Sequence, residues 1–276
     1  TSRYKRFTYI FRTIKKKINF NKWVAFWNGP IILRGERMKE EEFNEKIRES
    51  LKELNIELSE KQLNQFYNYM NILIEWNKVM NLTNITETEE IIQKHFVDSL
   101  TILKSIKEND SIIDVGTGAG FPGIPIKIAF PETRITLLDS LNKRIKFLEE
   151  VINKLELKNI ETIHGRAEEV AHNKKYREKY DIAIARAVAP LNVLSEYLLP
   201  FVKIGGYAIC MKGVKGKEEA EEGKNAIKIL GGKITNSREF NLPNTEMART
   251  IIQIEKIKNT EKKYPRKAGT PTKMPL

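Results

Sequence analysis

The spacing of hydrophobic residues divides the chain into a helical part and a part in which strands and helices alternate. Between residues 39 and 107, apolar side chains recur every three or four positions, which is the spacing of one helical face. Two later helices also have start signals, because Ser59 with Gln62 and Thr86 with Glu89 each form a capping-box pair. The first helix has its apolar face at Phe43, Ile47, Leu51 and Leu54. We therefore expect a small N-terminal helical region.

From residue 111 onward, short apolar runs typical of buried strands alternate with stretches of helical periodicity. Strands are expected at Ser111–Val115, Arg134–Asp139, Asn159–His164, Asp181–Arg186 and Tyr207–Met211. Helices are expected at Pro122–Phe130, Asn142–Leu155, Pro190–Leu199 and Lys217–Ile229. Such alternation predicts a parallel sheet that is covered by helices on both faces.

The end of the chain follows a different pattern. Two strand-like runs, Lys233–Phe240 and Arg249–Ile257, are separated only by residues 241–248, so there is no room for a crossover helix and they should be antiparallel. The predicted fold is α/β and Rossmann-like, with a seven-stranded, mostly parallel sheet and a terminal antiparallel hairpin. This is the layout of class I S-adenosylmethionine-dependent methyltransferases, whereas nicotinamide dehydrogenases usually have a sixth parallel strand and a separate catalytic domain.

The stretch Ile112–Gly123 reads IIDVGTGAGFPG, which indicates a buried strand that ends in a glycine-rich turn. Glycine permits positive φ angles and lets a ligand lie against bare backbone, so this turn is the expected nucleotide-binding loop. Its second half also satisfies the dinucleotide fingerprint G-x-G-x-x-G, so a nicotinamide enzyme remains an alternative. The four glycines are Gly116, Gly118, Gly120 and Gly123.

Residues at the carboxyl ends of the expected strands are the next candidates, because ligands bind at that edge of an open α/β sheet. Asp139 could accept hydrogen bonds from both hydroxyls of a ribose, and it could also cap a helix. Asp114, beside the glycine loop, could orient that loop or help to hold a ligand ammonium, and we favour the first role. The backbone of Ala167 and the carboxylate of Glu168 are placed to meet an adenine ring, although Glu168 could equally be a solvated acid at a helix start.

The fourth strand ends at Arg186, a fixed cation that could bind a carboxylate or a phosphate. The Asp/Asn-Pro-Pro-aromatic motif of many amine methyltransferases is absent here. Cys210, which a carbon-5 pyrimidine methyltransferase would need as an accessible nucleophile, lies within an apolar strand and is expected to be core. His95 is expected to be a satisfied, partly buried histidine. The pattern therefore favours a target that needs neither a nucleophile nor a strong base, such as a ring nitrogen with a free lone pair.

The composition narrows the class of protein. A single cysteine excludes a disulfide framework and a cysteine-based zinc cluster, and three histidines without metal-ligand spacing predict no metal. No apolar run is long enough to span a membrane, so a soluble protein of the cytoplasm without a membrane partner is expected.

The net charge of +12 is concentrated at the two ends of the chain. Residues 1–37 carry ten Lys or Arg against one acid, residues 256–276 carry seven against one, and the part between has a net charge of −3. The leader 1–37 could be an RNA-binding arm, a transit peptide or a segment outside the native protein. We favour the last, with Met38 as the native start. The intact mass of the protein from its natural host would test this, and a product that retains Thr1–Arg37 would contradict it.

Several motifs in order make a family resemblance specific. From residue 38 to residue 276 the chain resembles the bacterial small-subunit ribosomal RNA guanine-N7 methyltransferase G family, once called glucose-inhibited division protein B. The resemblance divides the chain into a helical region 38–107, a methyltransferase domain 108–258 and a basic tail 259–276. The matching stretches are Trp76–Thr83 (WNKVMNLT), His95–Ser99 (HFVDS), Asp114–Pro125 (DVGTGAGFPGIP), Leu137–Leu141 (LLDSL) with Lys143-Arg144, Arg186-Ala187, and Pro265–Leu276 (PRKAGTPTKMPL).

The resemblance implies S-adenosylmethionine as the cofactor and a guanine in a conserved hairpin of 16S ribosomal RNA as the substrate. The positions carried over as cofactor contacts are Gly116, Phe121, Ala167, Glu168 and Arg186. On the physical arguments above, Gly118 and Asp139 are added to them. The expected protein is a monomer that binds ribosomal RNA or an assembling small subunit and not DNA.

The expected mechanism is alignment, because guanine N7 is already nucleophilic at neutral pH and no residue has to remove a proton. No general base or other catalytic residue is therefore assigned, although Arg186 is a candidate for alignment. Two further alternatives are a nicotinamide oxidoreductase and a non-catalytic RNA-binding protein on the same fold. The candidates to hold phosphate or guanine O6 are Arg186, Arg166 and Lys212. The residues that could extend the RNA-binding surface are Lys143, Arg144, Arg266 and Lys267. Each of these residues could equally be a solvated surface base.

Overall fold

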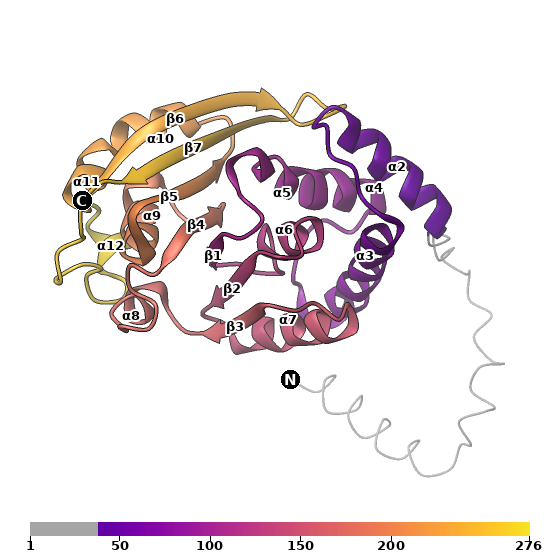
Figure 1. Cartoon of the computed structure of the whole chain (residues 1–276), viewed down its shortest axis with the longest axis horizontal. Helices are drawn as coiled ribbons and strands as arrows, with labels where there is room; N and C mark the ends of the chain where they lie inside the picture. The colour runs from indigo at the N-terminus through magenta and orange to yellow at the C-terminus, as the bar shows by residue number, and fades with distance from the viewer. Residues whose placement is uncertain (1–37) are drawn as a thin grey trace, which may run out of the picture. The chain divides into compact units, whose positions relative to one another are not determined.

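A seven-stranded sheet in the order β3-β2-β1-β4-β5-β7-β6 forms the centre of the fold in the computed structural model (Figure 1). The structure describes residues 38–276, so the expectations for the leader 1–37 lie outside it. Strands β1 to β5 are parallel, whereas β7 is antiparallel to both β5 and β6. The predicted fold class is thereby confirmed. The strands are β1 (Ser111–Val115), β2 (Arg134–Asp139), β3 (Ile160–His164), β4 (Tyr180–Arg186), β5 (Val202–Lys212), β6 (Gly232–Asn241) and β7 (Ala248–Lys256).

Helices cover both faces of the sheet, as the alternation predicted (Figure 1). Helices α6 (Gly123–Ala129) and α7 (Asn142–Lys154) pack on one face, against β2 and β3. Helices α8 (Ala167–Val170), α9 (Leu191–Leu198), α10 (Gly216–Glu222) and α11 (Lys224–Ile229) lie with the η4 turn (Leu199–Phe201) on the other side.

The single helix expected at Lys217–Ile229 is wrong, because the chain breaks there into α10 and α11 at Gly223. A side chain at this glycine would come within 3.2 Å of Leu191 on α9, so close packing and low helix propensity coincide at the break.

Three of the N-terminal helices are α2 (Glu40–Lys52), α3 (Glu60–Met80) and α4 (Thr88–Ile91). The capping box at Ser59 is confirmed, since its side chain accepts from the backbone of Gln62 and the Gln62 side chain accepts in return. The second predicted box is wrong: α4 begins two residues after Thr86, and its N-cap, Glu87, makes no side-chain cap bond. The preceding loop is held instead by Asn77, which bonds both the N–H and the C=O of Thr83.

The helical region continues from α4 into a wide π-helical turn, η2 (Ile92–Val97), followed by α5 (Asp98–Leu100) and the 3₁₀ turn η3 (Leu103–Ser105). Turns of this kind occur preferentially at functional sites. Phe96 in η2 packs with Phe66 and Tyr69 of α3 at ring-centroid distances of 5.1 and 5.4 Å. Tyr69 in turn packs on Phe121 of the glycine loop at 5.4 Å. Aromatic contacts therefore join the helical region directly to the loop after β1.

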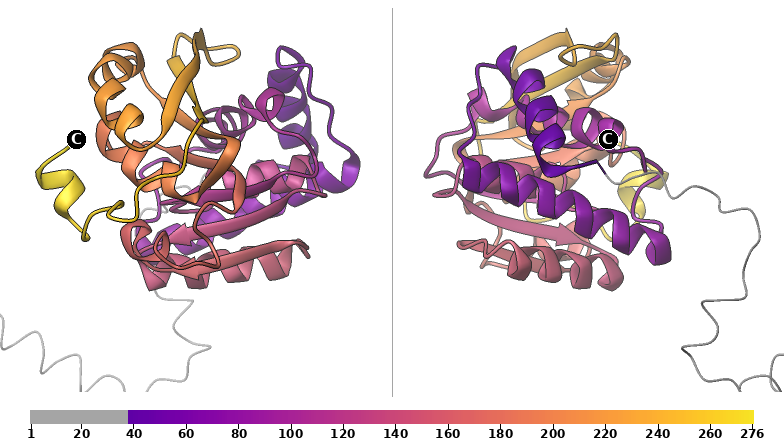
Figure 2. Two further views of the ribbon diagram at one scale, coloured as in Figure 1. Left: turned by 60° about the vertical axis from the view of Figure 1, so that its left-hand side comes forward. Right: turned by 90° about the vertical axis from the view of Figure 1, so that its right-hand side faces the viewer.

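Near the end of the chain, drawn in yellow in Figure 2, the short helix α12 (Thr270–Lys273) packs against α9. Together with the sheet and the N-terminal helices, α12 belongs to one compact unit, Glu40–Leu276. Within the described part of the chain, no helix is both long and apolar enough to cross a membrane.

Candidate functional site

Two neighbouring cavities open at the carboxyl edge of the sheet. The larger, of about 690 Å³, is lined by the loop after β1, the ends of β2, β4 and β5, the start of β7 and the η2 turn. The smaller, of about 160 Å³, lies toward α8. The two share Gly116, Asp139, Ser140 and Val188, so one elongated ligand can occupy both. Val188, which is 38% exposed, lies between them and approaches the bare face of Gly116.

The glycine loop is held in place by side chains from three elements. Asp114 of β1 accepts bonds from the Thr117 hydroxyl at 2.6 Å and the Gly123 amide at 2.9 Å. Asp139 of β2 accepts from the Gly118 amide at 2.9 Å. Tyr69 of α3 donates its hydroxyl hydrogen to the carbonyl of Ala119. The loop is therefore rigid before any ligand binds.

Two backbone groups of this loop are left free to meet a ligand. Gly116 and Gly118 have φ angles of +71° and +64°, which turn the loop around the cavity. Among the described residues, neither the carbonyl of Gly116 nor the amide of Ala119 has a hydrogen-bond partner, and both residues line the larger cavity. A carbonyl accepts from an ammonium and an amide donates to a carboxylate, so this edge suits an amino-acid zwitterion.

Asp114 is fully buried, and burial raises its pKa to about 6. Its Oδ2 carries both hydrogen bonds, whereas Oδ1 has no partner in the described structure. The expectation that this carboxylate orients the loop agrees with these contacts.

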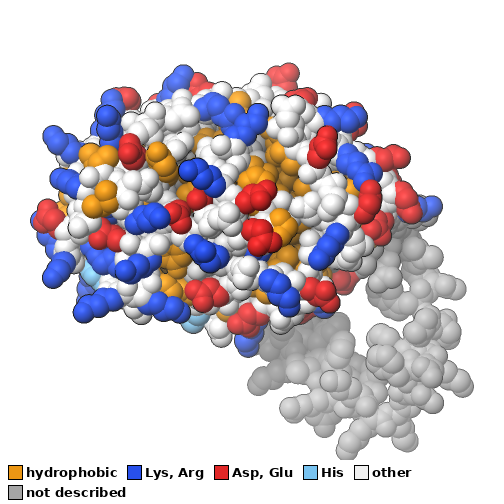
Figure 3. All heavy atoms as spheres, viewed as in Figure 1, with side chains coloured by type: hydrophobic (Ala, Val, Ile, Leu, Met, Phe, Trp, Pro, Cys, Tyr) orange, Lys and Arg blue, Asp and Glu red, His pale blue; other side chains and the backbone are white. Residues whose placement is uncertain are grey.

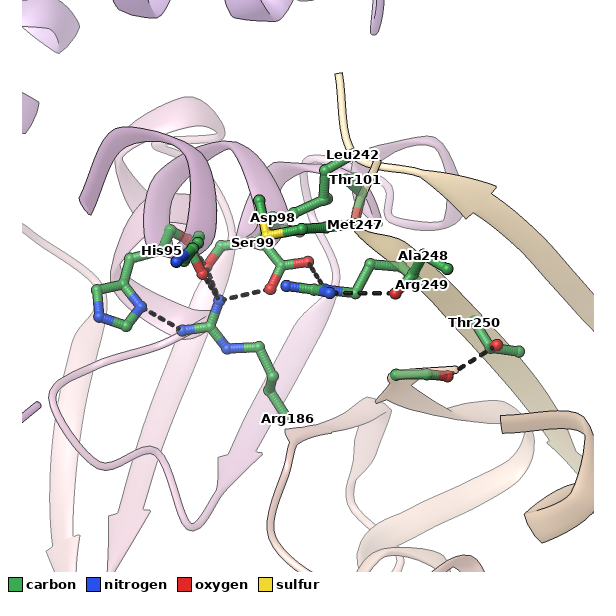
Figure 4. Close-up of polar contacts among 12 residues, drawn as sticks. His95, Asp98, Ser99, Thr101, Arg186, Leu242, Met247, Ala248, Arg249 and Thr250 are labelled. Atoms are coloured by element: carbon green, nitrogen blue, oxygen red, sulfur yellow. Dashed lines mark hydrogen bonds and ion pairs between the residues drawn. The ribbon is translucent and has the colours of Figure 1, made fainter. Parts of the chain in front are cut away.

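A buried carboxylate joins two arginines on the opposite side of the larger cavity (Figure 4). Asp98 of α5 accepts from Nη1 of Arg186 at 3.1 Å and from Nε of Arg249 at 3.1 Å. Arg186 ends β4 and Arg249 lies near the start of β7, so Asp98 links the helical region to both halves of the sheet. Arg186 is largely committed, since it also donates to the carbonyl of Lys94 and to Nδ1 of His95. Arg249 keeps Nη2 without a partner among the described side chains.

His95 is a neutral, structural histidine. Its pKa falls to about 3 because it is buried and faces the Arg186 guanidinium. Its Nδ1 accepts from Arg186, so its Nε2–H donates to the hydroxyl of Thr83 at 3.0 Å. The ring also stacks on Phe121, with centroids 4.4 Å apart. This agrees with the expectation of a satisfied histidine.

The smaller cavity is lined by Ala167 and Glu168 of α8, by Arg166 and by Tyr197 of α9. Glu168 is only 6% exposed, and its Oε1 accepts from the backbone amide of Gly269 at 3.0 Å. The hydroxyl of Tyr197 lies 3.0 Å from the hydroxyl of Thr272. The tail therefore supports two side chains of this cavity.

The basic residues considered from the sequence fall into different environments. Lys143 and Lys267 are exposed and line neither cavity. Arg144 and Lys212 line the larger cavity, but Arg144 pairs with Asp139 at 3.2 Å and Lys212 with Glu219 at 2.7 Å. Arg266 forms a forked pair with the buried Glu196, with Nη2 2.7 Å from Oε2. On the face seen in Figure 3, Lys and Arg side chains are interspersed with acidic ones and form no single patch.

The structure thus brings most of the sequence-derived candidates to one edge of the sheet. Gly116, Gly118, Phe121, Asp139 and Arg186 line the larger cavity, and Ala167 and Glu168 line the smaller one. Cys210 is buried, and its pKa rises to about 12, so it is not a nucleophile. No cluster of three or more candidate metal ligands occurs among residues 38–276. Among the lining residues that were not assigned a role from the sequence are Asp98, Arg249, Val188 and Tyr197.

Comparison with known proteins shows to which family the chain belongs. The family model described as rRNA small subunit methyltransferase G matches residues 62–251. The chain belongs to this family. A protein named ribosomal RNA small subunit methyltransferase G from Alkaliphilus metalliredigens is 53% identical over 83% of this chain and 97% of its own length. Proteins of the same name from Lachnoclostridium phytofermentans and Acetivibrio thermocellus are 56% and 57% identical over 83% and 80% of this chain, and 95% and 91% of their own lengths.

Membership of the rRNA small subunit methyltransferase G family confirms the family and the enzyme class predicted from the sequence, an S-adenosylmethionine-dependent methyltransferase. The nicotinamide oxidoreductase and the non-catalytic RNA-binding protein are set aside by it. The cavity fits the cofactor's parts, because free backbone groups at Gly116 and Ala119 suit the amino-acid end and Asp139 lies where the two cavities meet.

Removing the carboxylate between the two arginines should destabilise the protein. Asp98→Ala leaves two guanidinium ions, 14% and 23% exposed, without their shared counter-ion, so we expect the free energy of unfolding to fall by about 3–5 kcal/mol. Urea unfolding measures this. Glu221→Ala is the matched control, because its pair with Lys224 is exposed and should contribute less than about 1 kcal/mol. Equal effects of the two substitutions would contradict the role of Asp98 as the shared counter-ion of the two arginines.

Asp114 should make stability depend on pH. Its pKa is about 6 in the folded protein, against an ordinary 3.8, so the folded state binds a proton that the unfolded state does not between these values. Stability should therefore rise as the pH falls from 7 to 5, by about 1 kcal/mol relative to Asp114→Asn. Urea unfolding of both proteins at pH 7 and pH 5 measures how far the free energy of unfolding changes in each. The same change in both proteins would contradict the raised pKa of Asp114.

Proposed function

We propose that this protein transfers a methyl group from S-adenosylmethionine to N7 of a guanine in 16S ribosomal RNA, and that it acts as a monomer on RNA or an assembling small subunit. The ribosomal RNA substrate follows from the family, whose relatives carry that substrate in their names. The choice of N7 rests on the chemistry of the cavity.

The observation that carries the proposal is that the larger cavity offers no side chain suited to remove a proton. In the described structure, His95 has a pKa of about 3 and its Nδ1 lone pair already accepts from Arg186. Asp98 is shared by two arginines, and Asp139 accepts from two backbone amides and from Arg144. A target that keeps a free lone pair at neutral pH, such as guanine N7, needs no base.

The bound cofactor would supply an electrophilic methyl group on a positively charged sulfur. In the proposal, the Gly116 carbonyl and the Ala119 amide hold its amino-acid end, and Gly118 and Phe121 form the adjoining wall. Asp139 accepts from the ribose, since a carboxylate with three bonds keeps room for a further one. Ala167 and Glu168 meet the adenine in the smaller cavity. These residues bind and align, and no proton leaves the reacting nitrogen.

On the RNA side, the cations at the mouth of the larger cavity are the proposed contacts. Arg249 has an unused Nη2, and Lys212 and Arg186 line the same wall. Arg186 is deeply committed to Asp98 and to the η2 turn, so its proposed role is to set the shape of this wall. The exposed Lys143, Arg166 and Lys267 would extend the contact to phosphates.

Mapping of methylated positions tests the function directly. Small subunits from cells that lack the protein are incubated with it and with radiolabelled S-adenosylmethionine, and N7-methylguanine is located by borohydride reduction and aniline cleavage. One labelled 16S guanine is expected. Label on another atom, or in the large-subunit RNA alone, would overturn the proposal.

Filling the bend of the loop should block the cofactor. Gly118 has a φ of +64° and open space around it, with only the Gly116 carbonyl within 4 Å, at the wall of the cavity. Gly118→Val should weaken S-adenosylhomocysteine binding by about tenfold or more, measured by calorimetry. Gly205→Val is the matched control, because Gly205 has a similar φ of +81° and open space but lines neither cavity. Equal loss in both variants would mean that backbone strain alone is responsible.

A further inference from the structure

The C-terminal tail, residues 259–276, is held by polar contacts at several points between Thr260 and Thr272. Arg177 donates to the carbonyls of Thr260 and Tyr264 at 2.8 and 2.9 Å. Arg266 pairs with Glu196 of α9, whose side chain is fully buried. These contacts fix the course of the tail along α9 and the segment around Arg177.

Near its end, the tail contacts two side chains that line the smaller cavity. There the backbone amide of Gly269 donates to Oε1 of Glu168 at 3.0 Å, and the Thr272 hydroxyl meets the hydroxyl of Tyr197 at 3.0 Å. Gly269 has a φ of +80°, a left-handed turn that directs its amide at the carboxylate and that glycine adopts without strain. Both contacted side chains line the cavity.

The two oxygens of Glu168 are in different situations. Oε1 is taken by the tail, whereas Oε2 has no hydrogen-bond partner in the described part of the chain, although the residue is only 6% exposed. A free glutamate side chain samples several rotamers, and fixing one of them has an entropic cost. The hydrogen bond from the Gly269 amide fixes the Glu168 rotamer before a ligand binds, and it leaves one carboxylate oxygen free to accept from that ligand.

We propose that the tail is a positioning element of the adenine subsite: Gly269 holds Glu168 so that its second oxygen faces the exocyclic amine of the cofactor, which selects amino-purine over oxo-purine ligands. The inference rests on the proposed function, which places adenine in this cavity. An oxo-purine turns a carbonyl oxygen toward the carboxylate, so an acceptor faces an acceptor and no hydrogen bond forms.

The test compares two probes, S-adenosylhomocysteine and S-inosylhomocysteine, which differ only in the amine or carbonyl at purine C6. In the full chain we expect calorimetry to show about 10–100-fold tighter binding of the adenosine compound, the usual effect of a hydrogen bond to a charged group. A chain that ends at Lys267 loses Gly269 and α12 but keeps the Arg266 anchor, and the preference should fall below about threefold, mainly through weaker binding of the adenosine compound.

Gly269→Pro is the second variant, because it keeps the full length while removing the amide donor and the left-handed turn. If circular dichroism shows that the shortened chain does not fold, the purine preference of Gly269→Pro alone tests the role of the tail. Lys263→Ala, at an exposed position of the same tail, should keep the full-length preference. Retention of that preference by Gly269→Pro, or its loss in Lys263→Ala, would overturn the proposal.

Glu168→Gln separates failure of this inference from failure of the proposed function. If Glu168→Gln in the full chain leaves the preference unchanged, adenine does not meet Glu168, and the proposed cofactor placement is wrong. If Glu168→Gln abolishes the preference but Gly269→Pro does not, the cofactor placement stands and the role of the tail is wrong. Combining Glu168→Gln with the shortened chain should add no further change in the ratio, because both act through one carboxylate.

Discussion

The shape of the loop after β1 is the constraint on which the site depends. Its backbone is hydrogen-bonded by Asp114 of β1, by Asp139 of the neighbouring strand β2 and by Tyr69 of α3. Because these three side chains are buried and come from separate elements, the loop can form only when the sheet and the helical region have packed together. Rigid backbone next to an open cavity lets ligand groups bind without first ordering the loop, which reduces the entropic cost of binding.

The opposite wall of the larger cavity also depends on contacts between parts of the chain that are far apart in the sequence. Asp98 lies 88 residues from Arg186 and 151 from Arg249 along the chain, yet it holds both guanidinium groups. The wall is therefore built from the helical region, the parallel sheet and the terminal hairpin together. The neutral His95 and the wide η2 turn support this arrangement, since the Lys94 carbonyl of η2 accepts from Nη1 of Arg186 and the imidazole Nδ1 accepts from Nη2.

Local patterns were sufficient to predict the strands of the sheet and the sheet edge at which the two cavities open. Strands β1 and β2 match their predicted bounds, because apolar runs ended by Gly or Asp are unambiguous. The break at Gly223 and the failed cap at Thr86 were decided by packing and by a loop bonded to Asn77, which local sequence does not reveal. Arg249 carried no local signal, and Asp98 stood out only as part of the His95–Ser99 motif, because the contact between these two residues lies across the fold. Arg266 looked like a surface base because its partner, the buried Glu196, appeared as an ordinary helical acid.

Because β7 is antiparallel to β5, it brings its first residues, rather than its last, to the carboxyl edge of the sheet. The turn between β6 and β7 lies at the carboxyl edge, and the start of β7 brings Arg249 to the mouth of the cavity. Register between β5 and β7 is fixed further down, from Lys212 paired with Thr250 to Tyr207 paired with Glu255. The turn itself is anchored, because Leu242 is only 1% exposed and its amide donates to the carbonyl of Met247. The hairpin thus brings one arginine to the cavity from a part of the chain that is separate from the glycine loop after β1.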